Sequence, residues 1–147
     1  MDAITCNRTS KDQNLSSRGN RKVMVLELCR DRMFSTTSAN YTYIYLSPGL
    51  DGLGPMIESM VIHADGQNFG AEFNYEVSAE LSFDGISWEE FSGPFITNQT
   101  AEGYKISTPF NAVQNFGMKI RFRVGVKHTT TATTGVLSVV GAIKFWS

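Results

Sequence analysis

The chain has 147 residues and a formal net charge of -1, with 41% hydrophobic and 18% charged residues. This length suits one domain with a full hydrophobic core, and the near-neutral charge argues against bulk electrostatic attraction to nucleic acid. Two cysteines are too few for a disulfide framework, and no apolar run has the length of a signal peptide or a membrane span. We therefore expect a protein made in the cytoplasm, without a membrane segment.

Residues 1–22 are polar, basic and rich in Asn, Ser and Arg, so they cannot bury enough apolar surface to order themselves. We predict an extended N-terminal arm over 1–22 and one folded domain over 23–147. Within the domain, short apolar or alternating runs are separated by segments rich in Gly, Pro and Asn, which is typical of strands and their connections. The predicted strands are 23–29, 40–47, 56–63, 72–83, 88–91, 104–108, 118–127 and 136–146.

This arrangement of about eight short strands, with no long helical pattern, predicts an all-β fold. We expect a single antiparallel β-sandwich, most simply a jelly roll. The lack of crossover helices argues against a parallel sheet. The connections are expected at 48–55, 64–70, 111–117 and 128–135.

Two predicted strands alternate strictly between apolar and polar residues, which indicates one buried and one wet face. The polar face of 72–83 is acidic, and the polar face of 118–127 is basic. The charged residues of these two faces are Glu72, Glu76 and Glu80, and Lys119, Arg121, Arg123 and Lys127. Their opposition belongs to a wider split, because residues 33–104 hold ten acidic and no basic side chains, and 105–147 hold six basic and no acidic ones.

These opposed faces have two interpretations, and the sequence leaves both open. If the strands are neighbours in one sheet, cross-strand pairs stabilise the sheet by roughly 0.2–1 kcal/mol each and help to fix its register. If the strands lie apart, the acidic face of one copy meets the basic face of another, and a head-to-tail assembly results.

Aromatic residues supply a second candidate surface. Tyr41, Tyr43 and Tyr45 lie on one face of a predicted strand, where they would pack, contact a partner protein or stack on a sugar. Together with the seven charged residues they form the candidate assembly interface. Phe69 is the aromatic residue of the loops 48–55, 64–70 and 128–135, and it is the candidate glycan contact.

Catalytic and metal-binding patterns are not evident. His63 and His128 have no Cys, His or Asp at ligand spacing, and no nucleophile motif occurs. Glu89 and Glu90 are adjacent, so on a strand they point to opposite faces and make a poor acid/base pair. We therefore expect a non-enzymatic protein without catalytic residues, cofactor or metal. The cations of 118–127 have no interleaved aromatic residue, so nucleic acid is not an expected partner.

The string Ser82-Phe83-Asp84-Gly85-Ile86-Ser87-Trp88-Glu89-Glu90-Phe91 carries an Asp-Gly turn between apolar residues. It resembles the S-x-D-G-x-x-W hairpin of discoidin-like domains, which are galactose-binding-like jelly rolls. The resemblance covers about half the chain and implies a jelly roll with a carbohydrate-binding function. The chain departs from the extracellular members because it lacks their bracketing disulfide and an export signal.

The features together favour a structural assembly protein that associates with copies of itself or with other proteins. A virion component of a bacteriophage, such as a capsid decoration or tail-associated protein, would combine an extended arm, charge-segregated strands and no catalytic residues. The alternative is a carbohydrate-binding module of discoidin-like type, for which the partner is a glycan.

Overall fold

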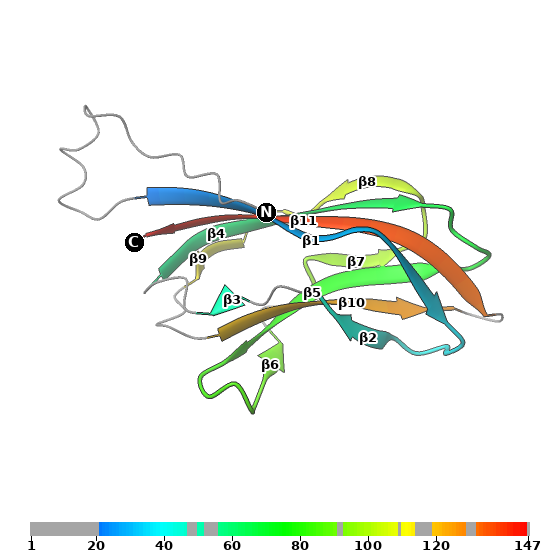
Figure 1. Ribbon diagram of the computed structural model, residues 1–147, viewed down its shortest axis with the longest axis horizontal. Helices are drawn as coiled ribbons and strands as arrows, with labels where there is room; N and C mark the ends of the chain where they lie inside the picture. Colours follow the sequence, from blue (N-terminus) through cyan, green and yellow to red (C-terminus); the bar gives the residue numbers. More distant parts are fainter. Residues whose placement is uncertain are drawn as a thin grey trace.

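The computed structural model describes residues 21–46, 50–51, 56–90, 93–108, 110–113, 119–128 and 132–146. Within these residues the chain forms eleven strands and no helix (Figure 1). The strands are β1 (Arg21–Thr36), β2 (Thr42–Tyr45), β3 (Leu50–Asp51), β4 (Met56–Gln67), β5 (Asn74–Ser82), β6 (Glu89–Glu90), β7 (Ile96–Gln99), β8 (Gly103–Ile106), β9 (Phe110–Val113), β10 (Lys119–Lys127) and β11 (Thr133–Trp146). The predicted arm lies outside the described residues, except that the backbone of its last two residues already belongs to β1.

The described strands form two antiparallel sheets, one above the other in Figure 1. Sheet A has the order β1-β11-β4-β8, with β9 also pairing with β4. Sheet B has the order β2-β10-β5-β6, with β3 pairing with β10 and β7 with β5. The strand pairs are nested along the chain and alternate between the sheets. β1 pairs with β11 in sheet A, β2 and β3 pair with β10 in sheet B, β4 pairs with β9 in sheet A, and β5 pairs with β7 in sheet B. This is the arrangement of a jelly roll, so the predicted antiparallel β-sandwich is confirmed.

The core lies between the two sheets and is filled from both. The alternation of β10 places its even-numbered residues inward, as the sequence predicts, and they are fully buried. The largest fully buried side chains are Phe34, Met60, Ile62, Leu137 and Ile143 of sheet A, Tyr75, Val77, Ile120, Phe122 and Val124 of sheet B, and Phe73 just before β5. They belong to one continuous cluster, which is the expected core of two sheets packed face to face.

Several strands extend beyond their predicted ends. β4 runs to Gln67 and β11 begins at Thr133, so parts of the predicted connections 64–70 and 128–135 are strands. Residues 64–67 pair with 136–139 of β11, and residues 133–135 pair with 34–36 of β1. The predicted loop 111–117 likewise contains most of β9, which pairs with β4. Pairing with a long neighbour satisfies the backbone polar groups of these segments, and this outweighs their weak local strand propensity.

Edge strand β1 carries a bulge that interrupts its pairing with β11. The register shifts twice between Glu27 and Arg32, and Asp31 has a φ of 44°. The Asp31 N–H donates to Ser138 Oγ at 2.8 Å, which replaces a lost ladder bond. A bulged edge is a poor template for another strand, so the contact surface of this protein is better sought on the faces and loops.

Candidate protein-interaction surface

The two charged strands are neighbours in sheet B. β5 pairs with β10 in a register that sets Glu80 opposite Arg121 and Glu76 opposite Gly125. The interpretation in which these strands lie apart is therefore wrong. Their acidic and basic side chains lie together on the outer face of sheet B, where they neutralise each other within one chain.

Glu80 is the centre of this outer face. Its Oε1 accepts a hydrogen bond from Arg121 Nε at 2.8 Å, and its Oε2 accepts one from Arg123 Nη1 at 3.2 Å. The Glu80 and Arg123 side chains are only 10% and 11% exposed. Arg123 also donates from Nε to Ser78 Oγ at 2.8 Å and lies 3.6 Å from a carboxylate oxygen of Glu90. One nearly buried carboxylate thus binds two guanidinium groups, which fixes both.

Aromatic rings cover the two fixed guanidinium groups. Cζ of Arg121 lies 4.0 Å from the ring centroid of Tyr45 and 4.1 Å from that of Trp88. Cζ of Arg123 lies 3.8 Å from the ring centroid of Tyr43. These distances are well inside the range of cation–π attraction. The tyrosines of β2 and the arginines of β10 therefore form one layer above the sheet.

A row of three residues crosses the sheet from β2 to β5. Tyr43 lies opposite Gly125, and Gly125 lies opposite Glu76. The Tyr43 hydroxyl reaches over the glycine and donates to Glu76 Oε1 at 2.7 Å. A Cβ at position 125 would lie 2.8 Å from the Tyr43 ring and 3.1 Å from Glu76 Cγ. The glycine that interrupts the basic alternation therefore makes room for the aromatic ring.

This layer changes the environment of β5. The sequence predicts a wet outer face for that strand, but Asn74, Glu76, Ser78, Glu80 and Ser82 are all buried. The prediction fails because long Tyr and Arg side chains from β2 and β10 lie across the short polar ones of β5. The strand is buried on both faces.

The remaining candidate residues lie around this layer. Tyr41 donates from its hydroxyl to Asn74 Oδ1 at 2.8 Å, and Lys127 Nζ lies 4.4 Å from the Tyr41 ring centroid. Lys119 lies at the other end of β10, opposite Ser82. Glu72 is not part of β5 as predicted; it is exposed in the preceding turn, with a φ of 59°.

The outer face still presents aromatic surface to solvent. Tyr43 is 37% exposed and Tyr45 is 44% exposed, and both are held by the arginines beneath them. Tyr, Trp and Arg are the residues that dominate protein–protein hot spots, and side chains that are already ordered lose less entropy on binding. The arrangement is suited to contact with another protein surface.

Other kinds of site receive no support from the described part of the chain. It contains no group of three or more His, Cys, Asp or Glu side chains that could hold a metal ion. The same residues include no helix that is long and apolar enough to cross a membrane.

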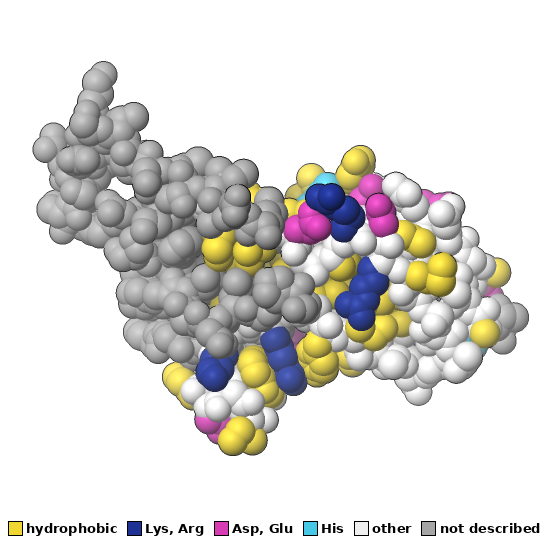
Figure 2. Space-filling model, in the orientation of Figure 1, with side chains coloured by type: hydrophobic (Ala, Val, Ile, Leu, Met, Phe, Trp, Pro, Cys, Tyr) yellow, Lys and Arg dark blue, Asp and Glu magenta, His cyan; other side chains and the backbone are white. Residues whose placement is uncertain are grey.

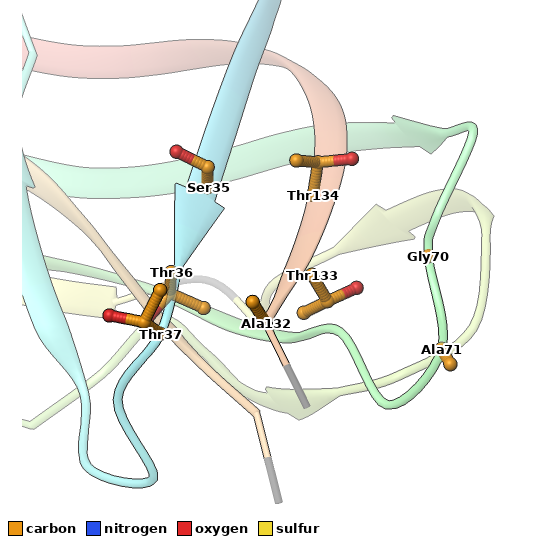
Figure 3. Close-up of a pocket in the computed structure, with 8 residues that line it drawn as sticks. All are labelled: Ser35, Thr36, Thr37, Gly70, Ala71, Ala132, Thr133 and Thr134. Atoms are coloured by element: carbon orange, nitrogen blue, oxygen red, sulfur yellow. The ribbon is translucent and has the colours of Figure 1, made fainter. Parts of the chain in front are cut away.

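An open pocket of about 450 Å³ lies at one end of the sandwich. It is lined by the end of β1, the start of β11 and the loop before β5, as Figure 3 shows. Its lining residues are Ser35, Thr36, Thr37, Gly70, Ala71, Ala132, Thr133 and Thr134. Five of these eight side chains carry a hydroxyl group, so the pocket can offer hydrogen bonds to a neutral polar ligand.

Phe69, the candidate glycan contact, is partly buried and packs against the core. Its ring centroid lies 4.7 Å from that of Phe73 and 5.8 Å from that of Tyr75. Because its ring packs against these aromatic residues, Phe69 is a packing residue and not a platform for a sugar.

Comparison with known proteins identifies the fold but not a family. No protein-family model matches the chain, and no curated protein matches it in sequence. Among solved structures, the chain is similar to the VP2 subviral particle of infectious bursal disease virus, with a TM-score of 0.61 and 13% identity over 86% of this chain. The structure of the Gx strain of the same virus gives a TM-score of 0.58 and 14% identity. The chain covers 33% and 32% of those two chains, about a third of their length.

Two carbohydrate-binding modules match this chain with a lower TM-score, 0.42. The module CBM61 in complex with β-1,4-galactotriose matches with a TM-score of 0.42 and 12% identity, over 85% of this chain and 82% of that chain. At these identities the viral structures support the jelly-roll fold alone, and the lower TM-score of the module adds no argument.

Replacing Glu80 tests the central interaction of the outer face. Glu80→Ala leaves two guanidinium groups without their shared carboxylate, one of them almost buried, so the free energy of unfolding should fall by about 3 kcal/mol. Urea denaturation followed by tryptophan fluorescence measures the change. The matched control is Glu89→Ala, an exposed carboxylate, for which a change within about 0.5 kcal/mol is expected. Equal effects of the two variants would contradict the central role of Glu80.

Tyr43 should titrate at unusually high pH. Burial and then the hydrogen bond to Glu76 raise the pKa of Tyr43 from 10.0 to about 12. A raised pKa means that the folded state holds the proton more tightly, so this contribution to stability is complete below pH 10 and is lost as the pH rises to about 12. The tyrosinate absorbance of wild type minus that of Tyr43→Phe should therefore rise near pH 12. A rise near pH 10 would contradict the hydrogen bond to Glu76.

Proposed function

We propose that this protein is a non-enzymatic structural component of a virion, such as a capsid decoration or tail-associated protein of a bacteriophage, that associates with copies of itself. The observation that carries the proposal is the preorganised Tyr–Arg layer on the outer face of sheet B. The pairing of Glu80 with Arg121 and Arg123 means that the acidic and basic faces are not the contact themselves. The paired arginines instead hold the tyrosine rings, and these rings make the contact.

The fold supports the proposal in a general way. The similar viral structures include one described as a VP2 subviral particle and one described as derived T=1 particles, so proteins of similar fold occur in viral particles. This chain matches about a third of those VP2 chains, so the support extends to one jelly-roll domain.

The proposal predicts association that depends on the aromatic layer. Light scattering on the full chain should show a mass above that of the monomer, increasing with protein concentration. Tyr45→Ala, which removes a 44% exposed ring from sheet B, should weaken association by about tenfold. Tyr104→Ala, which removes a 69% exposed ring from sheet A, is the matched control and should leave association unchanged. A wild-type protein that stays monomeric at every concentration would overturn the proposal.

A second candidate function is carbohydrate binding, and the hydroxyl-lined pocket at the end of the sandwich is the observation that favours it. Ser35, Thr37 and Thr134 line this pocket and are exposed. Neutral hydroxyl groups are suitable partners for sugar hydroxyls, since they both donate and accept hydrogen bonds. None of the described residues that line the pocket is aromatic, so these residues would hold a sugar by hydrogen bonds without stacking.

A glycan array with the full chain tests this second function. A bound glycan should lose most of its signal with Thr134→Val, which keeps the side-chain shape and removes one hydroxyl group from the pocket. Thr42→Val, at an exposed threonine of β2 in the other sheet, should bind like the wild type. An array without any bound glycan would overturn carbohydrate binding and leave the assembly proposal standing.

A further inference from the structure

Strand β2 forms an edge of sheet B, and its backbone is open on one side. Among the described strands, β10 alone pairs with β2, and β5 lies on the other side of β10 (Figure 1). The N–H of Leu46, just after β2, donates to the Phe122 carbonyl at 2.8 Å, so the even-numbered residues of this segment point their backbone N–H and C=O groups toward β10. Because these groups alternate along a strand, those of Tyr43 and Tyr45 point away from β10, where a further strand can bind them.

The side chains of β2 leave this edge uncovered. The Tyr43 ring reaches across Gly125, and its hydroxyl donates to Glu76 of β5 at 2.7 Å. The Tyr45 hydroxyl accepts a hydrogen bond from Nη2 of Arg121, on β10, at 3.2 Å. Both rings therefore lean over sheet B, away from the free edge. Figure 2 shows hydrophobic side chains, in yellow, at the lower border of the sandwich, where Figure 1 places β2.

β2 also lacks the features that protect several other edge strands from pairing. β1 is bulged, with Asp31 at a φ of 44°. β6 consists of two glutamates, and β8 carries Lys105 and, at Gly103, a φ of 101°. Bulges and charges, above all lysine, are common ways to keep an edge strand from pairing. The four residues of β2, Thr-Tyr-Ile-Tyr, are uncharged, and β-branched and aromatic residues favour strands.

We propose that β2 pairs antiparallel with β2 of a second copy of this chain, so that sheet B continues from one molecule into the other. A two-fold axis normal to sheet B relates the copies and passes between their Ile44 residues. In this register Tyr43 of each copy lies opposite Tyr45 of the other, and the free N–H and C=O groups of these residues bond across the axis. This is an isologous contact, in which the same strand meets itself. The inference rests on the proposed function and names the geometry of its contact.

The residues of β2 favour a second copy as the occupant. In the proposed register Tyr43 lies opposite Tyr45 on the outer face, and Ile44 lies opposite Ile44 on the inner face. Aromatic and β-branched cross-strand pairs stabilise a sheet, whereas like charges directly opposite each other destabilise it. Since β2 carries no charge, nothing in its sequence opposes an identical strand, and each side-chain pair is of a favourable kind.

The same register joins the Tyr–Arg layers of the two copies. Residues that bond across an antiparallel pair lie on one face of the sheet, and the residues with free backbone groups, Tyr43 and Tyr45, belong to the outer face. Pairing of β2 with itself therefore sets the two layers side by side and shields rings that are 37% and 44% exposed in the single chain. The aromatic contact and the strand pairing are thus parts of one interface.

A crosslink at Ile44 tests the pairing and its register. Across the axis the two Ile44 residues form a non-hydrogen-bonded pair with Cα atoms about 4.5 Å apart, a distance that a disulfide can join. Ile44→Cys in a Cys6→Ser/Cys29→Ser background should therefore give a disulfide-linked dimer under mild oxidation. The control Thr42→Cys in the same background should form no disulfide, because the two copies of residue 42 lie about 13 Å apart along the strands.

The crosslink separates strand pairing from a contact between outer faces. Ile44 is partly buried and packs against the core, so a contact made by the outer faces alone cannot bring two copies of it together. Association of the wild type without a crosslink at Ile44 would overturn the strand pairing and leave the proposed function standing. A crosslink at Thr42 without one at Ile44 would overturn this register.

A proline at position 45 tests the backbone hydrogen bonds. Tyr45→Pro and Tyr45→Ala both remove the ring, but only the proline also removes the N–H at the free edge. Proline is tolerated in an edge strand where its nitrogen faces away from the ladder, so the variant should fold, and circular dichroism checks this. In sedimentation experiments Tyr45→Pro should associate about tenfold more weakly than Tyr45→Ala, because a hydrogen bond is lost on each side of the axis.

The two variants at position 45 also distinguish this inference from the proposed function. Equal association of Tyr45→Pro and Tyr45→Ala would overturn the strand pairing, whereas the proposed function requires only that both associate more weakly than the wild type. Should Tyr45→Pro fail to fold, the Ile44 crosslink decides the question. A wild type that stays monomeric at every concentration would overturn both, and would leave the edge of β2 for a strand of another protein.

Discussion

The carboxylate of Glu80 is the interaction on which the outer face of sheet B depends. It binds Arg121 and Arg123 at once. Without it, Arg123 would keep Glu90, 3.6 Å away, as its acidic partner among the ion pairs of the described residues. Because Glu80 and Arg123 are nearly buried, each needs the other to compensate for lost hydration. The pairing also favours a single register of β5 and β10, since a shift by one residue would turn these side chains into the core.

The fixed arginines determine where the aromatic side chains lie. Arg121 contacts the rings of Tyr45 and Trp88, and Arg123 contacts the ring of Tyr43, so the exposed rings are ordered before any partner binds. Glu80, Arg121 and Arg123 are therefore paired within the molecule, and the exposed part of this layer is aromatic. This is a reason to look for contacts of this protein at Tyr43 and Tyr45, and not at the paired charges beside them.

The sequence predicts those parts of the fold that depend on local pattern. The alternation in 118–127 correctly identifies the buried face of β10, because that strand has one apolar side. The same pattern in 72–83 misses the burial of Glu76 and Glu80, because their cover comes from side chains on β2 and β10. The Tyr43–Glu76 bond depends on a register that brings Gly125 between two residues 33 positions apart in the chain. The short strand β9 likewise exists through its pairing with β4, and its own residues give little signal.

The two candidate functions use different parts of the molecule. The Tyr–Arg layer covers the outer face of sheet B, and the hydroxyl-rich pocket lies at the end of the sandwich where β1 ends and β11 begins. Their residues do not overlap, because the layer is made by β2, β10 and Trp88, and the pocket is lined by residues 35–37, 70–71 and 132–134. Association through the layer and glycan binding in the pocket are therefore compatible in one domain, and substitutions can abolish either one without changing the residues of the other.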